Sequence, residues 1–212
     1  MLQDMRVEYG QGAFDKGDLD GHPVVQFERW FREAVAAGVE EPNAMTLATA
    51  SADGYPSARV VLLKDYRPEG FTFFTNYDSR KGEELRENAR AALVFFWAAL
   101  QRQVRIEGTV GMLLREESVR YFQRRPRGSQ LGAWASPQSK EVPDRQFLLD
   151  RWKAMESTFE GQEVLPAPPH WGGYLVMPHT VEFWQGQAGR MHDRLCYRRS
   201  SEGGWTVVRL AP

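Results

Sequence analysis

Cysteine is almost absent from the sequence, since Cys196 is the only one among 212 residues. A single cysteine excludes an intrachain disulfide. Long apolar runs are also missing: the longest, Ala91 to Leu100, is far shorter than the roughly 20 residues of a membrane-spanning helix. The N-terminus lacks the basic-then-apolar layout of a signal peptide. We therefore expect a soluble protein of a reducing compartment, the cytoplasm, with no membrane partner.

An excess of charge of either sign is missing too. Lys and Arg number 27 and Asp and Glu number 28, which gives a formal net charge of -1. A nucleic-acid-binding protein is expected to present a broad basic face, so this balance argues against nucleic acid as a partner. Hydrophobic residues make up 42% of the chain, which is ample for a core and excludes disorder of the whole chain.

Standard catalytic motifs are not found. The sequence has no phosphate-binding P-loop, no glycine-rich dinucleotide fingerprint and no zinc-protease motif. Its histidines stand far apart and lack the spacing of metal ligands, so we expect no metal site; they are His22, His170, His179 and His192. The chemistry is therefore expected in clusters of basic and polar residues.

Residue patterning predicts a mainly β protein. Strand-like runs cover residues 45–51, 57–65, 71–76, 92–98 and 102–113, and strand patterns return after Pro169. Helical spacing predicts helices from Pro23 to Gly38, from about Ser79, from Glu116 to Gln123 and from Asp144 to Phe159. Because the early connections are too short for helical crossovers, the strands should pair antiparallel. We expect an α+β protein, mainly β, with a closed or partly closed barrel and peripheral helices.

The first 21 residues differ from the rest in composition. They are polar and contain several glycines, so we expect residues 1–21 to form a mobile N-terminal arm without a core of its own. No repeat, low-complexity tract or internal boundary interrupts the remainder. Residues 22–212 are therefore expected to form a single domain.

Two basic clusters lie at the ends of predicted elements. A strand over residues 57–65 carries Arg59 and Lys64 near its ends, as an edge strand with solvated ends also would. Arg80 and Lys81 follow a helix cap at Asp78 or Ser79, where cations are unfavourable because the helix N-terminus is already partly positive. They suggest a bound phosphate, with a solvated basic patch as the alternative.

A third cluster lies in the stretch from Tyr121 to Ser139. Helical spacing places Tyr121 and Arg125 on one face, and Pro126 must end that helix. The phenol, the guanidinium and the hydroxyl of Ser129 then suit a phosphate monoester. An arginine that only ties down a loop is the alternative.

A fourth cluster follows Trp184 and two glycines. Arg190, His192 and Arg194 alternate as strand residues do, so we expect them to point to one side as three cationic or titratable groups. Cys196 extends the alternation, and we expect it to be an inert hydrophobic residue.

Taken in order, these stretches resemble the pyridoxamine 5'-phosphate oxidase family over nearly the whole chain. The resemblance is carried by RVVLLKD, FFTNYDSRKG, RQVRIEG, YFQRRPRGSQLGAWASPQS, EFWQGQAGRMHDR and the C-terminal RLAP. It implies an FMN-binding split β-barrel and a homodimer with one FMN at each of two subunit interfaces. The two anion sites would then hold different phosphates, one of the cofactor and one of the substrate.

The resemblance also implies roles for individual residues. FMN contacts would fall on Arg59, Val60, Val61, Leu62, Phe74, Thr75, Arg80, Lys81, Gln103, Gln138, Ser139, Trp184 and Arg194. The substrate phosphate would be bound by Lys64, Tyr121, Arg125 and Ser129. The catalytic residues Arg190 and His192 would lie beside the substrate ring, with Arg6 and Tyr9 of the arm closing over it.

The implied reaction is oxidation of pyridoxine or pyridoxamine 5'-phosphate to pyridoxal 5'-phosphate. A hydride would move from C4' of the substrate to flavin N5, and O2 would reoxidise the flavin to give H2O2. With the amine, hydrolysis of the imine would release ammonia. The alternatives are a flavin reductase, a non-catalytic FMN or pyridoxal phosphate binder on the same barrel, and a single-stranded nucleic-acid binder.

Overall fold

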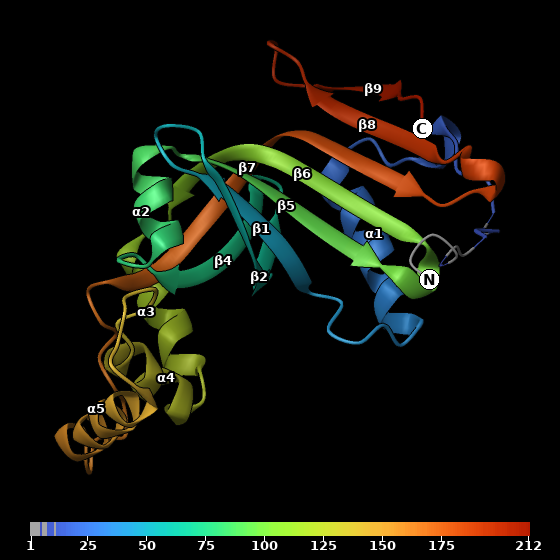
Figure 1. The fold of residues 1–212 in the computed structure, drawn as a ribbon. Coiled ribbons are helices and arrows are strands. Elements are labelled where there is room, and N and C mark those ends of the chain that lie inside the picture. The colour runs from blue at the N-terminus through green and yellow to red at the C-terminus, as the bar shows by residue number, and fades with distance from the viewer. Residues whose placement is uncertain (1–4, 6–7, 11) are drawn as a thin grey trace.

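The computed structural model of the protein describes residues 5, 8–10 and 12–212, and within them nine strands form one sheet. The strands are β1 (Ala44–Ala50), β2 (Pro56–Leu62), β3 (Asp65–Arg67), β4 (Gly70–Asn76), β5 (Arg90–Trp97), β6 (Arg102–Met112), β7 (Trp171–Gln185), β8 (Asp193–Arg199) and β9 (Trp205–Arg209). Their order is β2-β1-β5-β6-β7-β4-β3, with β8 added to β7 and β9 to β8. Every pairing is antiparallel, and the sheet curves into a half-barrel (Figure 1). The predicted fold class is confirmed.

Helices lie around this half-barrel. They are α1 (Pro23–Ala36), α2 (Arg80–Glu87), α3 (Arg115–Arg124), α4 (Arg127–Ala135) and α5 (Arg145–Thr158), with short 3-10 turns η2 (Lys16–Asp18), η3 (Ala98–Leu100) and η4 (Ala188–Arg190). Helices α3, α4 and α5 gather at one end of the molecule, whereas α1 lies against the sheet (Figure 1). The molecule therefore has a helical end, formed by α3, α4 and α5, next to the sheet (Figure 1).

Helix α1 supplies the centre of the core. Pro23 at its start has a favourable fixed φ, and Gly38 beyond its end adopts a φ of 70°. The ring of Phe27 lies 5.0 Å from that of Phe95, and Trp30 lies 5.2 Å from Phe183. These rings are fully or almost fully buried, so the helix is held to the inner face of the sheet mainly by aromatic packing.

The strand pattern after Pro169 begins with the single long strand β7, residues 171–185. A shift in register lies opposite Glu107 and Gly108, where β7 has one residue more than β6. A Cβ atom at Gly108 would lie 2.3 Å from the carbonyl oxygen of Met177. Only glycine therefore allows the two strands to approach so closely at this bulge.

The helical end of the molecule contains one element that sequence reasoning did not anticipate. Pro126 ends α3 as expected, but it also takes the N-cap position of α4, so the small residues after it form a helix. Helix α5 follows its predicted bounds, yet none of its residues is fully buried. It lies against α4 through Trp152, whose ring is beside Gly128 and Gly132.

The described part of the N-terminal arm lies against the barrel. Phe14 is buried, and its carbonyl oxygen accepts a hydrogen bond of 3.0 Å from Arg209. The amide of Gly10 donates to the side chain of Gln101 at 3.0 Å. The division into a mobile arm, residues 1–21, and a single domain, residues 22–212, stays a prediction.

None of the helices in the described residues is long and apolar enough to cross a membrane.

Candidate functional site

A cavity of about 470 Å³ opens between the sheet and the helical end. Strands β2 and β4, the start of α2 and the junction of α3 with α4 surround it. Its lining consists of Arg59, Val60, Val61, Leu62, Lys64, Phe74, Thr75, Asn76, Lys81, Tyr121, Arg125, Pro126, Ser129, Gln138 and Trp171. The structure therefore brings together most of the residues predicted for the FMN site and the whole predicted phosphate set of the substrate.

Stacked aromatic rings form one wall of this cavity. Phe74 and Tyr121 stack with their centroids 4.0 Å apart, and Phe74 stacks on Trp171 at 5.4 Å. The guanidinium of Arg125 lies 4.7 Å from the centre of the Trp171 ring, within the range of a cation–π contact. The rings hold Arg125 and Tyr121 in fixed positions at the cavity wall.

The surroundings of Arg125 favour the binding of an anion. Its Nη1 is buried and has no hydrogen-bond partner among the described residues. Burial lowers the pKa of this guanidinium and raises the pKa of the neighbouring Tyr121 phenol. Because an unpaired buried donor is costly, the arrangement favours an acceptor bound at this point.

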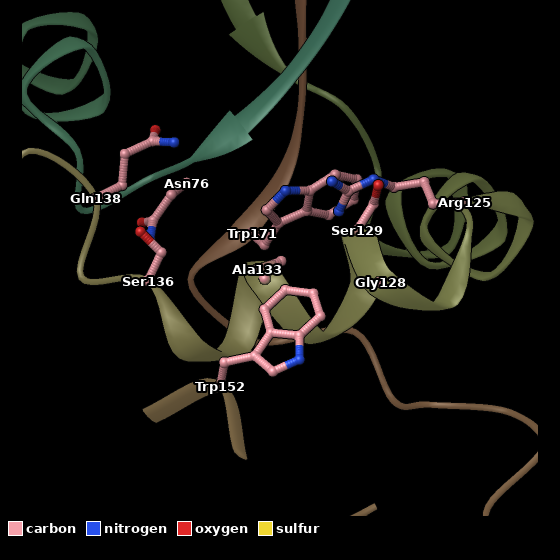
Figure 2. Close-up of a pocket in the computed structure, with 10 residues that line it drawn as sticks. Asn76, Arg125, Gly128, Ser129, Ala133, Ser136, Gln138, Trp152 and Trp171 are labelled. Atoms are coloured by element: carbon pink, nitrogen blue, oxygen red, sulfur yellow. The ribbon is translucent and has the colours of Figure 1, made fainter. Parts of the chain in front are cut away.

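A second cavity, of about 350 Å³, continues beyond Arg125 and Ser129 (Figure 2). Figure 2 shows Arg125 and Ser129 beside Trp171, with Trp152 next to α4. The chamber also includes Asn76 and Gln138, both of which line the first cavity. The two cavities therefore share a wall at the predicted phosphate site.

Lys81 forms a separate cationic position at the start of α2. Its Nζ donates to Thr75 Oγ1 at 3.2 Å and to Gln138 Oε1 at 2.9 Å. Ser79 caps the helix, accepting from the amide of Gly82. Burial and then the charge of Arg59 lower the pKa of Lys81. With only neutral acceptors on its ammonium group, this residue is suited to an anion.

Another group of predicted residues gathers at the opposite end of the strands. Gln103 pairs with Trp184 across β6 and β7, and Trp184 pairs with Arg194 across β7 and β8. The Trp184 ring lies 4.6 Å from that of His192 and 5.7 Å from that of Tyr9. None of these residues lines the cavity described above. One chain therefore holds the predicted site as two separate clusters.

The expected strand alternation of Arg190, His192 and Arg194 is wrong. Arg190 ends the turn η4 with a φ of 63°, after Gly189 with a φ of 61°, and β8 begins only at Asp193. Two successive left-handed residues turn the chain sharply, which an extended strand cannot accommodate. His192 instead faces back into the loop, where its Nδ1 accepts from the amide of Gln187 at 3.1 Å.

The remaining predicted positions are more peripheral. Arg80 and Ser139 are exposed and do not line the cavity. Arg6 lies outside the described residues. Cys196 is buried, and burial raises the pKa of its thiol, as suits an unreactive residue.

Sequence reasoning missed several residues at the site. The cavities are also lined by Asn76, Trp152 and Trp171. Each of these residues is brought there by packing against parts of the chain that are distant in sequence. Glu84 lies behind Arg59 and Arg80 and accepts from Arg80 Nε at 2.9 Å. Its spacing of four residues from Arg80 is a helical ion-pair signal that could have identified it.

Comparison with known families gives two matches. The description "Pyridoxamine 5'-phosphate oxidase" matches residues 31–159. The description "Pyridoxine 5'-phosphate oxidase C-terminal dimerisation region" matches residues 171–212. The latter range contains Trp184, His192 and Arg194, so most of the second cluster falls within a region described as a dimerisation element.

Comparison with individual proteins covers the whole chain. A pyridoxine/pyridoxamine 5'-phosphate oxidase from Salinibacter ruber is 55% identical over 212 residues, 100% of this chain and 99% of that protein. One from Acaryochloris marina is 54% identical, over 100% of this chain and 95% of that protein. The crystal structure of PhzG from Burkholderia lata 383, in complex with tetrahydrophenazine-1-carboxylic acid, has a TM-score of 0.89 at 32% identity, over 96% of this chain and 99% of that chain. An FMN-binding protein from Nostoc punctiforme, with a TM-score of 0.71 at 15% identity over 88% of this chain and 97% of that chain, shares the fold.

Proposed function

Since the chain belongs to the pyridoxamine 5'-phosphate oxidase family, we propose that it is an FMN-dependent oxidase that makes pyridoxal 5'-phosphate. The substrates would be pyridoxine 5'-phosphate and pyridoxamine 5'-phosphate, with O2 reduced to H2O2. The observation that carries this proposal is a single cavity with two separate anion positions, one at Lys81 and one at Arg125. A protein that bound only FMN would need one phosphate site, whereas this oxidase needs two.

The position at α2 fits the phosphate of FMN. Lys81 has only neutral hydrogen-bond acceptors on its ammonium group, and Arg59 lines the same cavity. The helix N-terminus adds partial positive charge. The cofactor assignment is thus supported by the chemistry of the donor set as well as by family membership.

The position at α3 and α4 fits the phosphate of the substrate. Arg125 offers a buried, unpaired Nη1, and Tyr121, Ser129 and Lys64 line the same space with neutral and cationic donors. A charge-assisted hydrogen bond from a partly desolvated guanidinium is strong and directional. We infer that this set selects phosphorylated substrates over free vitamers.

FMN, when bound, supplies the hydride acceptor and the route to O2. The protein's own task is to hold the substrate ring in place and to exclude water. His192 has its Nδ1 occupied as an acceptor, so the neutral ring carries its proton on Nε2. We infer that Nε2 donates a hydrogen bond to the substrate, while Arg190 orients the substrate ring.

A homodimer would complete the site. The cavity and the cluster of Gln103, Trp184 and Arg194 lie apart in one chain, and most of the second cluster falls in the region that matches a dimerisation element. We propose that this cluster of one protomer closes the cavity of its partner. Two equivalent sites then follow from twofold symmetry.

Oxygen uptake tests the proposal. The purified protein, supplied with FMN, should consume O2 and form the aldehyde with pyridoxine 5'-phosphate and with pyridoxamine 5'-phosphate, but not with unphosphorylated pyridoxine. A protein that binds FMN yet consumes no oxygen with either phosphate would instead be a flavin binder or an enzyme of other specificity. The unphosphorylated control separates a true second phosphate site from general reactivity of the flavin.

A further inference from the structure

Glu84 is a buried carboxylate at the back of the α2 anion position. It is 5% exposed and bridges the two arginines on either side of it. Its Oε1 accepts from Arg80 Nε at 2.9 Å, and its Oε2 lies 3.4 Å from Arg59 Nη2. One carboxylate therefore holds two predicted cofactor-binding cations, one through each oxygen.

Two hydroxyl groups extend this network into the sheet. Ser57 donates to Glu84 Oε2 at 2.6 Å, and Thr49 donates to the same oxygen. Arg59 in turn donates to both hydroxyl oxygens. The guanidinium of Arg59 is therefore fixed through strands β1 and β2 as well as through α2, and this redundancy restricts its rotamer.

The charges around Glu84 balance a phosphate. Arg59, Arg80 and Lys81 contribute three positive charges and Glu84 one negative charge, which leaves a net charge of +2. A phosphate monoester carries roughly -1.5 to -2 at neutral pH. Burial by itself would raise the pKa of Glu84, but hydrogen bonds from Ser57, Thr49 and Arg80, with the charge of Arg59, lower it to about 2. Glu84 is therefore ionised at neutral pH.

We propose that Glu84 is a positioning residue that holds Arg59, which lines the cavity, in place for the cofactor phosphate, with Arg80 outside the cavity lining as its second partner, and thereby makes the site select FMN over riboflavin. The inference rests on the proposed function, because it takes the anion at α2 to be the phosphate of the flavin. Glu84 itself touches no ligand in this assignment; it acts through the two arginines.

The substitution Glu84→Gln separates positioning from simple charge attraction. If only net charge mattered, removing a negative charge beside the phosphate would tighten FMN binding. If positioning matters, loss of the carboxylate frees both guanidinium groups and weakens it. We expect the FMN dissociation constant to rise about tenfold, while riboflavin binding changes by less than about twofold, as measured by quenching of flavin fluorescence. An FMN affinity equal to or tighter than that of the wild type would overturn the inference.

Controls distinguish this role from a purely structural one. Glu87→Gln removes an exposed carboxylate from the same helix and should leave both affinities unchanged. A merely structural Glu84 would lower both flavin affinities together, leaving their ratio at the wild-type value. If Glu84→Gln does not fold, Ser57→Ala removes one donor to Glu84 and one contact to Arg59, and should lower the FMN-to-riboflavin preference about threefold. A Ser57→Ala protein with the wild-type preference would also overturn the inference.

The wild-type protein provides the separate test of the proposed function. A wild type that binds FMN no better than riboflavin would contradict the phosphate site itself. A wild type with a clear preference for FMN that survives Glu84→Gln would contradict only the role of Glu84.

Discussion

Replacement of Arg125 by alanine is the most direct test of the substrate phosphate site. In the structure its guanidinium is partly desolvated, lies 4.7 Å from the centre of the Trp171 ring, and has an unpaired buried Nη1. A hydrogen bond to a charged group contributes roughly 1.5–3 kcal/mol. A loss of about 2–3 kcal/mol corresponds to a rise of roughly 30- to 150-fold in the apparent constant for the substrate.

The same geometry predicts how Arg125→Ala affects folding. The substitution loses a cation–π contact of roughly 0.5–2 kcal/mol. It also removes a buried donor that has no partner, and such a donor destabilises the folded wild type by roughly 1–3 kcal/mol. Since these terms have opposite signs and similar size, the free energy of unfolding should change little. Arg125→Ala should therefore lose affinity for the substrate while keeping nearly the stability of the wild type.

The assay is steady-state oxygen uptake at varied pyridoxine 5'-phosphate, with FMN content followed by absorbance and stability by thermal unfolding. Arg124→Ala is the matched control, because Arg124 is the preceding arginine, lies at the end of the same helix and is exposed. Unchanged kinetics in Arg125→Ala, with FMN retained, would refute the reasoning. A variant that loses FMN together with substrate affinity would place Arg125 at the cofactor instead.

Three further predictions address the dimer, the fold and the titration of the site. If the two clusters meet across a subunit interface, mixing Arg125→Ala with Arg190→Ala under subunit exchange should restore about a quarter of the wild-type activity at a substrate concentration where each variant alone is nearly silent, because half of the dimers are mixed and each has one intact site; no recovery, with exchange verified by mass spectrometry, would contradict the shared site. Gly108→Ala should lower the thermal unfolding midpoint by several degrees, since its Cβ would lie 2.3 Å from the backbone oxygen of Met177; an unchanged midpoint would show that the bulge yields easily. Because the pKa of Glu84 is lowered from 4.5 to about 2, its contribution to the free energy of unfolding is complete above the unfolded value and is lost as pH falls through the folded one. The difference in urea stability between wild type and Glu84→Gln should therefore be constant above about pH 5.5 and shrink below about pH 4.5, and a difference independent of pH would exclude an ionised Glu84.

Local features of the sequence determined the elements and much of the site. Alternation and short connections predicted the antiparallel strands, and Ser79 was correctly placed among the candidate caps of α2. The arginine, tyrosine and serine around Pro126 pointed to an anion, and they do line one cavity. These inferences succeeded because they depend on neighbours within one or two turns of the chain.

Local spacing failed where backbone conformation departed from regular structure. Arg190 and His192 were placed on a strand, but Gly189 and Arg190 adopt left-handed φ values that end any extended segment. No helix was predicted after Pro126, although the residues there form α4. In both places, residues that tolerate more than one backbone conformation left the choice to contacts elsewhere in the molecule.

The sequence by itself therefore determined the strands, most of the helices and the types of group that hold two anions. Only the tertiary structure decided that Trp171 supports Arg125, that Glu84 reaches Arg59, and that the Trp184 cluster lies away from the cavity. The physical reason is that such contacts join residues distant in the chain. They form only once the sheet has curved and packing has fixed which side chains meet.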